Sequence, residues 1–367
     1  MSAPARPARP RPSPSAGPVV DDAAVHFRLA DPGAAFAAVG LVQDIRRPRD
    51  WTPLDKVEGS DTWTLAFPRP DVDRMEYRFK GVHRDGGDET FCDPANPLRA
   101  PGAFGDKSVV EFPGYPRPAW LGDDRLGGDV FAAVVPSRAL RADVTVRVWS
   151  SRGAGEEEAL PLLVAHDGSE YAAYSRLLRL LDRMTTEGRL PPMRAALLDP
   201  VERDDHYSAS AAYARAMAVD VLPALEWLAP TPPGRHARVG MGASLGALAM
   251  LHLHWTRPDS FGALFLQSGS YFRQRYDRHE SGFPRFRRIS RLVAEILAAA
   301  SARRPVPTVM TCGTVEENLA NNRAVAAALE RLGYDVRLHV NRDAHNFVAW
   351  RDTFHPHLVD LLAAVWR

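Results

Sequence analysis

The sequence predicts an α/β protein in which a small N-terminal β-sandwich precedes a mostly parallel sheet covered by helices. In the C-terminal two thirds, short apolar runs alternate with longer helical patterns, which is typical of βαβ units. In the N-terminal third, short strand-like runs follow one another with turn residues between them. The chain has 367 residues, of which 45% are hydrophobic, and this is enough to form two domains.

The N-terminal third is predicted to contain a tail, a sandwich and a linker. Residues 1–19 are rich in Pro, Arg, Ala and Ser, and we expect them to form a disordered tail. Residues 20–118 are predicted to form the β-sandwich, and 119–127 to link it to the next domain. Its predicted strands are 25–29, 37–42, 62–67 and 75–79.

Residues 128–367 are predicted to form the catalytic α/β domain, because strand-like and helical patterns alternate along them. The predicted strands are 144–149, 162–165, 195–198, 237–241, 306–310 and 336–340. The predicted helices are 171–182, 211–228, 247–255, 287–300 and 318–332.

The segment Gly242-Ala243-Ser244-Leu245-Gly246 matches the pattern GxSxG between a predicted strand and a predicted helix. A serine on such a tight turn exposes its hydroxyl, and the next backbone N–H points toward a developing oxyanion. Ser244 is therefore the predicted nucleophile and the Leu245 amide an oxyanion donor, in an α/β-hydrolase domain. The alternative is a turn of small residues that merely packs a helix against a sheet.

The acid and the base should follow the nucleophile in that order along the chain. Glu316 follows the strand 306–310, so it lies at a strand end, where an open parallel sheet builds its site. Glu316 is the predicted acid, with Glu317 as the alternative, because a shift of one residue would exchange the two. His345 follows the strand 336–340 in a polar loop and is the predicted general base.

A second oxyanion donor is expected from a loop after an earlier strand. The strand 162–165 runs into His166-Asp167-Gly168-Ser169, a turn with glycine. The backbone N–H of Gly168 or Ser169 is the predicted donor. The alternative is an ordinary strand-to-helix turn in which Asp167 binds its own backbone.

With these motifs the sequence resembles the enterochelin (enterobactin) esterase family, which opens ferric siderophore trilactones. The resemblance covers most of the chain. It depends on residues 242–246, 268–272, Gly313 with Glu316, His345 with Trp350 and Arg351, and, in the N-terminal half, 59–63, 76–80 and 93–97. It implies a serine esterase with the triad Ser244, Glu316 and His345, and a substrate-side loop at 203–207 with Arg203 and His206.

The substrate implied by this resemblance is a ferric catecholate trilactone such as enterobactin. The segment 271–288 agrees with it, because arginines and aromatic residues there suit a polyanionic aromatic ligand. Candidate substrate contacts are Tyr271, Arg273 and Arg275 within it, and Trp350, which follows His345 in the sequence. The alternative for the segment is a solvated basic loop, or a face that docks the N-terminal domain.

Other functions stay open at this point. The scaffold also suits a general carboxylesterase, a feruloyl-type esterase or an acyltransferase. A ligand-binding protein with an inactive hydrolase domain is an alternative of another class. The predicted chemistry needs no metal and no organic cofactor, since serine, histidine and a carboxylate are sufficient.

Composition excludes several partner classes. The net charge is +1, so nothing indicates nucleic acid or an anionic membrane as a partner. No run approaches 18 uninterrupted apolar residues, so no transmembrane helix is expected. The only two cysteines, Cys92 and Cys312, lie far apart in the sequence and in different predicted domains, which argues against a disulfide framework or a cysteine metal site. Because the N-terminus lacks the apolar stretch of a secretory signal, we expect a cytoplasmic protein.

Overall fold

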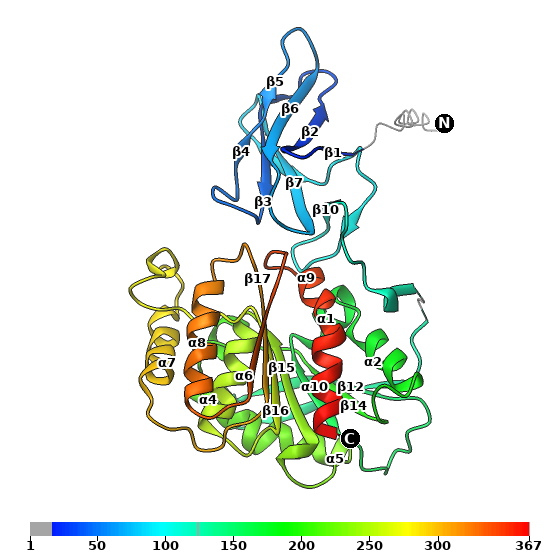
Figure 1. Ribbon diagram of the computed structural model, residues 1–367, viewed down its shortest axis with the longest axis vertical. Coiled ribbons are helices and arrows are strands. Elements are labelled where there is room, and N and C mark those ends of the chain that lie inside the picture. Colours follow the sequence, from blue (N-terminus) through cyan, green and yellow to red (C-terminus); the bar gives the residue numbers. More distant parts are fainter. Residues whose placement is uncertain (1–16, 123–124, 367) are drawn as a thin grey trace, which may run out of the picture. The chain divides into compact units, whose positions relative to one another are not determined.

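The computed structural model describes residues 17–122 and 125–366, and the chain divides into two compact units between Tyr115 and Pro116 (Figure 1). The predicted tail at 1–19 therefore lies mostly outside the described residues. Residues 119–122 of the predicted linker form a 3-10 helix, Ala119–Gly122, whose Trp120 is buried in the core of the second unit. Every helix in the described ranges is too short or too polar to span a bilayer.

The N-terminal unit is a β-sandwich, as predicted. One antiparallel sheet has the strand order β1-β2-β6-β5, and the other has the order β4-β3-β7-β10-β9, with β8 beside β7. Aromatic rings fill the space between them: Phe27 of one sheet lies edge-on to Tyr77 and Phe79 of the other, with centroids 4.7 and 6.5 Å away. The strands are β1 Val19–Val20, β2 Ala24–Ala30, β3 Phe36–Gln43, β4 Thr52–Pro53, β5 Asp55–Lys56, β6 Thr62–Pro68, β7 Arg74–His83, β8 Asp88–Phe91, β9 Arg99–Ala100 and β10 Lys107–Glu111.

The second unit contains an eight-stranded sheet with the order β11-β12-β14-β13-β15-β16-β17-β18. The six strands from β14 to β18 in this order are parallel, while β11 and β12 are antiparallel to their neighbours. The predicted, mostly parallel sheet is thus confirmed. The strands are β11 Asp129–Ser137, β12 Ala142–Ser150, β13 Leu162–His166, β14 Arg194–Leu198, β15 Arg238–Ala243, β16 Ala263–Gln267, β17 Thr308–Gly313 and β18 Val336–Asn341.

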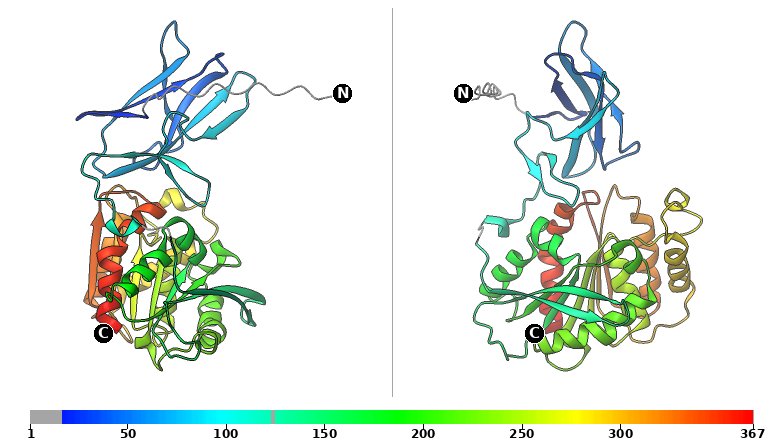
Figure 2. Two further views of the ribbon diagram at one scale, coloured as in Figure 1. Left: turned by 90° about the vertical axis from the view of Figure 1, so that its right-hand side faces the viewer. Right: turned by 180° about the vertical axis from the view of Figure 1, so that it is seen from behind.

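Helices cover both faces of this sheet (Figures 1 and 2). Alternate residues of β13 point to opposite faces of the sheet: Leu162 and Val164 belong to the hydrophobic core on the first face, and Leu163 and Ala165 to the core on the second. Helices α4 to α8 pack on the first face, and α1, α2 and α10 on the second. The helices are α1 Gly168–Tyr174, α2 Leu177–Thr186, α3 Arg203–His206, α4 Ala211–Ala216, α5 Leu222–Leu228, α6 Leu245–Thr256, α7 Phe286–Ala298, α8 Leu319–Arg331, α9 Phe347–Asp352 and α10 Val359–Trp366.

In the second unit, the structure differs from the predicted elements at several points. The helix predicted at 171–182 is two helices, because Arg176 between them adopts a left-handed backbone with φ of 55°. Strands β11 and β16 were not among the predicted strands. The apolar residues of β11 do not alternate with polar ones.

The order of the strands in the sheet indicates where the site lies. The chain moves from β13 to β14 on one side and then returns to β15 on the other side of β13. Such a reversal leaves a crevice at the carboxyl ends of the strands, where ligands bind in open α/β sheets. Two of the predicted motifs, the turn after β13 and the serine turn after β15, lie there next to each other.

Candidate active site

Ser244 lies at the sharp turn between β15 and α6, with φ of 55° and ψ of −122°. A non-glycine residue in this conformation costs on the order of 1–3 kcal/mol and persists only where the surroundings hold it. The Ser244 N–H donates to the Gln267 carbonyl of β16 at 2.9 Å. Gly242 must be glycine, since a Cβ there would lie 2.5 Å from the carbonyl carbon of Gly246. The turn is thus built to present one serine side chain.

Glu316 and His345 form a buried acid–base pair. The Glu316 Oε2 atom lies 2.7 Å from His345 Nδ1, and its Oε1 accepts from the Ser268 hydroxyl and the Gly313 N–H, each at 2.7 Å. Burial by itself would raise the pKa of Glu316. The charge of His345 and these three hydrogen bonds outweigh burial and hold the pKa below its ordinary value. Glu316 is therefore a carboxylate at neutral pH.

The tautomer of His345 follows from this contact. A carboxylate only accepts hydrogen bonds, so Nδ1 carries the proton and Nε2 is left as the basic nitrogen. Trp350 fixes the ring from the side, edge-on at 5.1 Å between centroids, and its Nε1 donates to the Ser268 hydroxyl at 2.9 Å. Trp350 is only 7% exposed, so it supports the histidine and offers little surface to a ligand.

The Ser244 hydroxyl pairs with a second serine. Its Oγ lies 3.1 Å from Ser270 Oγ, and in the part of the chain that the structure describes no hydrogen bond joins Ser244 to His345. Hydrogen bonds between catalytic groups are often long without substrate and shorten in the complex. Ser268 and Ser270, on one turn after β16, thus contact the predicted acid and the predicted nucleophile respectively.

Glu317, the alternative acid, faces away from this group. Its carboxylate lies 3.1 Å from His279 Nε2, and His279 is 3.6 Å from Glu280. These three are the one set of His, Cys or carboxylate groups close enough to share a metal ion within residues 17–122 and 125–366. All three are exposed or half-buried, as expected for solvated ion pairs. The structure brings Glu316, and not Glu317, against His345.

The predicted oxyanion donors lie at two helix starts. Leu245 is the first residue of α6, and Gly168 is the first residue of α1, where N–H groups have no partner within the helix. The Ser169 N–H donates to Asp199 Oδ1 at 3.1 Å and is therefore occupied. Gly168 packs so closely on β14 that a Cβ would lie 2.4 Å from Leu197 Cα. Of the two predicted residues, Gly168 keeps the available amide.

Arg203 binds Asp167 instead of projecting as a free cation. Its Nε and Nη2 donate to the two oxygens of Asp167 at 2.9 and 2.7 Å, and its guanidinium lies 5.6 Å from the centre of the Tyr207 ring. Asp167 is 4% exposed and has φ of 50°. The pair therefore ties the loop 203–207 to the turn that carries Gly168.

His166 is buried beneath the serine turn. Its Nδ1 lies 3.1 Å from the Gly246 carbonyl, which can only accept, so Nδ1 carries the proton and Nε2 accepts from the Tyr213 hydroxyl at 3.0 Å. Burial lowers the pKa of His166 to about 4. This histidine is neutral at pH 7 and links the turns after β13 and β15.

Two other predicted substrate contacts are largely enclosed. Tyr271 has no exposed surface, and its hydroxyl has no hydrogen-bond partner among the described residues. Burial raises the pKa of this phenol. His206 is 8% exposed and stacks on Tyr213 at 5.5 Å, and burial lowers its pKa. In this conformation neither side chain offers much surface to a substrate.

The arginine-rich segment is divided in its roles. Arg273 is held by Asn321, at 2.5 Å, and lies 4.2 Å from the centre of the Tyr276 ring. Arg275 and Arg278 are exposed, as is Tyr276 at 69%. This segment follows the turn with Ser270, so its exposed charges belong to the same edge of the sheet as Ser244.

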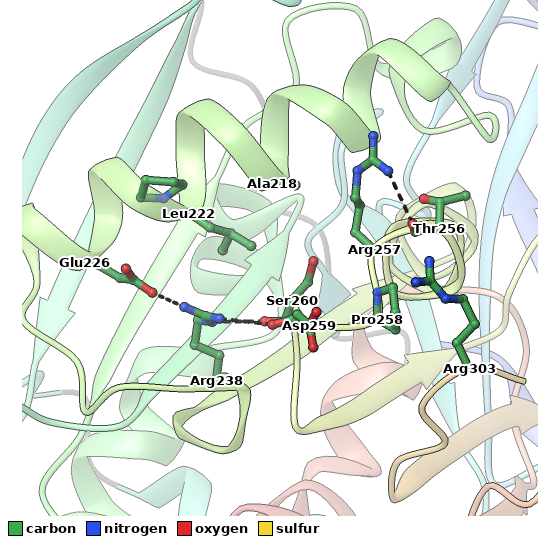
Figure 3. Close-up of a pocket in the computed structure, with 11 residues that line it drawn as sticks. Ala218, Leu222, Glu226, Arg238, Thr256, Arg257, Pro258, Asp259, Ser260 and Arg303 are labelled. Carbon is green, nitrogen blue, oxygen red and sulfur yellow. Dashed lines mark hydrogen bonds and ion pairs between the residues drawn. The ribbon is translucent and has the colours of Figure 1, made fainter.

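A separate pocket of about 350 Å³ lies at the opposite edge of the sheet (Figure 3). Arg238, on its wall, begins β15, whereas Ser244 follows the end of that strand. Arg238 donates to the carbonyls of Ser260 and Asp259, at 2.9 and 3.1 Å, and pairs with Glu226. None of the predicted site residues lines this pocket.

Sequence reasoning assigned no role to three residues of the site: Ser268, Ser270 and Asn322. They contact the predicted triad or its supporting turn. Ser268 and Ser270 were noted only within the segment 268–272 that carried the family resemblance. Asn322 lies in the first turn of α8, and nothing in its local sequence indicates that its amide reaches another loop.

Comparisons with known proteins identify the family of this chain. The family model described as "Putative esterase" matches residues 137–361, more than half of the chain. The iron(III) enterobactin esterase of Escherichia coli O6:H1 is 27% identical over 304 residues, which is 80% of this chain and 72% of that protein. The protein of the same name from Dickeya dadantii is 28% identical over 280 residues, 71% of this chain and 63% of that protein.

Solved structures show the same fold. The enterobactin esterase FES from Shigella flexneri, solved in the presence of enterobactin, has a TM-score of 0.75 and 21% identity, covering 95% of this chain and 96% of that chain. The ferric enterobactin esterase from Salmonella typhimurium has a TM-score of 0.75 and 20% identity, covering 93% of each chain. The predicted resemblance and the predicted fold are both confirmed. This chain belongs to the esterase family, has the α/β-hydrolase fold and is an ester-hydrolysing enzyme.

Proposed function

We propose that this enzyme hydrolyses the ester bonds of a ferric catecholate trilactone siderophore such as enterobactin, with Ser244, His345 and Glu316 as its triad. The choice of this substrate depends on the similarity, over most of the chain, to two proteins named iron(III) enterobactin esterase. The pair Glu316–His345 at 2.7 Å, beside a strained serine turn, supports the mechanism.

In the proposed acylation step, Ser244 Oγ attacks the ester carbonyl carbon while its proton moves to His345 Nε2. The Nδ1 proton stays between His345 and Glu316, whose carboxylate stabilises the imidazolium. His345 then gives the Nε2 proton to the departing alkoxide. The serine ester of the acid remains on the enzyme, and the alcohol leaves.

The tetrahedral oxyanion is proposed to accept hydrogen bonds from the backbone amides of Leu245 and Gly168. Removing one such donor costs about 3 kcal/mol of transition-state stabilisation in comparable sites. His166 and the Asp167–Arg203 pair support this geometry, because they hold the two turns that carry the amides. Water, deprotonated by His345, completes the cycle by attacking the acyl ester.

The arginine-rich segment is proposed to bind the negative charge of the substrate. A ferric tris-catecholate complex carries net negative charge and three aromatic rings. Arg275, Arg278 and Tyr276 are exposed and suit such a ligand through charge and stacking. Of these three, Arg275 is among the residues predicted to bind substrate, and it is better placed than the enclosed Tyr271 and Trp350.

We also propose that the enzyme acts in the cytoplasm on a small molecule, without a nucleic-acid or membrane partner. The net charge of +1 supports the absence of a strongly anionic partner. Cys92 and Cys312 are both free thiols, which suits a reducing compartment.

The decisive experiment is mass spectrometry of ferric and iron-free enterobactin after incubation with the wild type and with Ser244→Ala. We expect the wild type to release dihydroxybenzoylserine units in series. Ser244→Ala should be slower by roughly three to six powers of ten.

The alternatives predict other outcomes. Turnover of feruloyl or simple aryl esters without cleavage of enterobactin would make the enzyme a general or feruloyl-type esterase. An ester formed with an added alcohol would make it an acyltransferase. Binding of the siderophore without any Ser244-dependent turnover would make it a ligand-binding protein.

A further inference from the structure

We infer that Ser270 is a positioning residue for the nucleophile: its hydroxyl holds Ser244 Oγ during attack. This inference depends on the proposed role of Ser244. Its physical basis is one contact, the 3.1 Å separation of the two hydroxyl oxygens, together with the rigidity of the turn that carries Ser270.

Ser270 holds Ser244 at two points. The Ser270 N–H donates to the Ser244 carbonyl at 3.1 Å, and the hydroxyl oxygens of the two residues share a second hydrogen bond. Ser270 is 4% exposed, so water has little access to its hydroxyl. A buried hydroxyl needs a partner, and Ser244 Oγ is that partner.

The turn that carries Ser270 is fixed from behind by Asn322, which is fully buried. The Asn322 side chain accepts from the Gly269 N–H and donates to the Gly269 carbonyl, both at 3.0 Å. A Cβ on Gly269 would lie 2.2 Å from the ring of Tyr271, so the backbone approaches that ring as only glycine permits. The buried Tyr271 ring therefore packs directly against the backbone of this turn.

The same turn also holds the acid. Ser268, with φ of 48°, donates to Glu316 Oε1 at 2.7 Å. Its two serines therefore fix the nucleophile and the carboxylate relative to each other through three consecutive residues. Catalytic groups need such support, because displacements of about 1 Å reduce rates strongly.

Counting the protons and lone pairs of the two hydroxyls shows which one donates to the other during attack. Ser244 has one hydroxyl proton, and this proton must point to His345 Nε2 when the Oγ–carbon bond forms. The Ser270 hydroxyl then donates to a lone pair of Ser244 Oγ. This hydrogen bond keeps Oγ in the line of attack, and the Ser270 proton stays on Ser270 throughout.

The test is the second-order rate of labelling by a fluorophosphonate, which phosphonylates the nucleophilic serine and expels fluoride. This readout does not depend on the siderophore. We expect Ser270→Ala to label about 10- to 100-fold more slowly than the wild type, since Ser244 Oγ is then no longer held in the attacking position. Hydrolysis of p-nitrophenyl acetate should lose kcat by a similar factor with little change in KM.

Three further variants separate positioning from packing. Ser270→Cys keeps the volume but provides only a weak donor, and should also be slow. Ser270→Thr keeps the hydroxyl and should recover most of the rate. Ser290→Ala is the matched control, because Ser290 is also buried and bonds only the Phe286 carbonyl, at 2.8 Å. It should label at the wild-type rate.

The inference is overturned if folded Ser270→Ala or Ser270→Cys, with a wild-type melting temperature, labels as fast as the wild type. It is also overturned if all three Ser270 variants lose rate only in proportion to their loss of folded protein. Labelling of Ser244→Ala at the wild-type rate would instead refute the proposed nucleophile, so the two failures are distinct.

Discussion

Two buried carboxylates flank the serine turn, and each binds a different basic side chain. Glu316 is 7% exposed and contacts an imidazole, whereas Asp167 is 4% exposed and contacts a guanidinium. Both follow parallel strands at the same edge of the sheet. Burial and carboxylate chemistry alone therefore do not distinguish a proposed catalytic acid from a structural one.

The partner makes the difference. An imidazole bound through Nδ1 still has Nε2 free to take and return a proton, while a guanidinium stays charged and has no acceptor. The pair Glu316–His345 can therefore move protons, and the pair Asp167–Arg203 can only hold two loops together. Each prediction below removes or weakens one side of this comparison.

The largest effect is expected from Glu316→Gln. The amide is close in shape but cannot stabilise an imidazolium and can impose the wrong tautomer on His345. We expect kcat/KM for p-nitrophenyl acetate to fall by about 10³- to 10⁴-fold. Glu317→Gln is the matched control, because Glu317 contacts His279, and it should retain at least a third of the activity. Equal losses in the two variants would contradict the assignment of Glu316.

The sequence distinguished these carboxylates only in part. Motif and chain order singled out Ser244 and His345, because a GxSxG turn and a histidine after a late strand are local patterns. The choice between Glu316 and Glu317 stayed open, since neighbouring residues on a loop point in different directions and no periodicity indicates which one faces the site. The partner of Asp167, 36 residues away, is a tertiary contact.

The fold was predictable to a similar degree. Strands β13, β14, β15 and β17 were found as short apolar runs and β18 by its alternation, and most covering helices were found as helical patterns. The buried strand β16 was not among the predicted strands. Strands of two residues, such as β1, β4 and β5, have too few residues to show a pattern. The break at Arg176 was also hidden, because nothing in an arginine indicates a left-handed backbone.

The second prediction concerns a variant that breaks the pair Asp167–Arg203. Asp167→Asn should lower the free energy of unfolding by about 2 kcal/mol, below the full cost of opening a buried ion pair, because Arg203 keeps 37% of its side chain exposed. Asparagine tolerates the left-handed backbone at this position, so the turn itself can persist. Urea denaturation measures the loss.

This variant should keep a substantial share of its activity per folded molecule, in contrast to Glu316→Gln. A fall in kcat as large as that of Glu316→Gln, in a variant that is fully folded, would show that Asp167 takes part in the chemistry. The comparison between a proton-moving and a structural carboxylate would then be wrong.

A smaller effect should appear in the pH dependence of stability. The pKa of Glu316 is lower in the folded protein than its ordinary value, which the unfolded chain keeps. Glu316 thus contributes stability that is fully present above its ordinary pKa, roughly 4.3, and is lost as the pH falls through the folded-state pKa. The difference in unfolding free energy between the wild type and Glu316→Gln should shrink from pH 7 to pH 3. A constant difference would indicate that the carboxylate is not stabilised by folding.

The smallest effect concerns charges that no carboxylate of the site neutralises. Replacing both Arg275 and Arg278 by Gln should raise KM for ferric enterobactin by about 3- to 10-fold, since exposed charges interact weakly and are screened by salt. Arg273 is left unchanged because it binds Asn321, and its loss would disturb the segment. The control is Arg303→Gln, which removes an exposed arginine at the opposite edge of the sheet.

The wild-type advantage should shrink at high salt and be absent for a neutral aryl ester. If KM for the neutral ester rises equally, the segment shapes the site and does not read charge. If Arg303→Gln has the same effect, the enzyme attracts the siderophore through its overall charge, and no particular loop is responsible. Only a change limited to the anionic substrate and to the Arg275 and Arg278 variant places recognition beside the serine turn, on side chains that, unlike Arg203, are not engaged by a buried carboxylate.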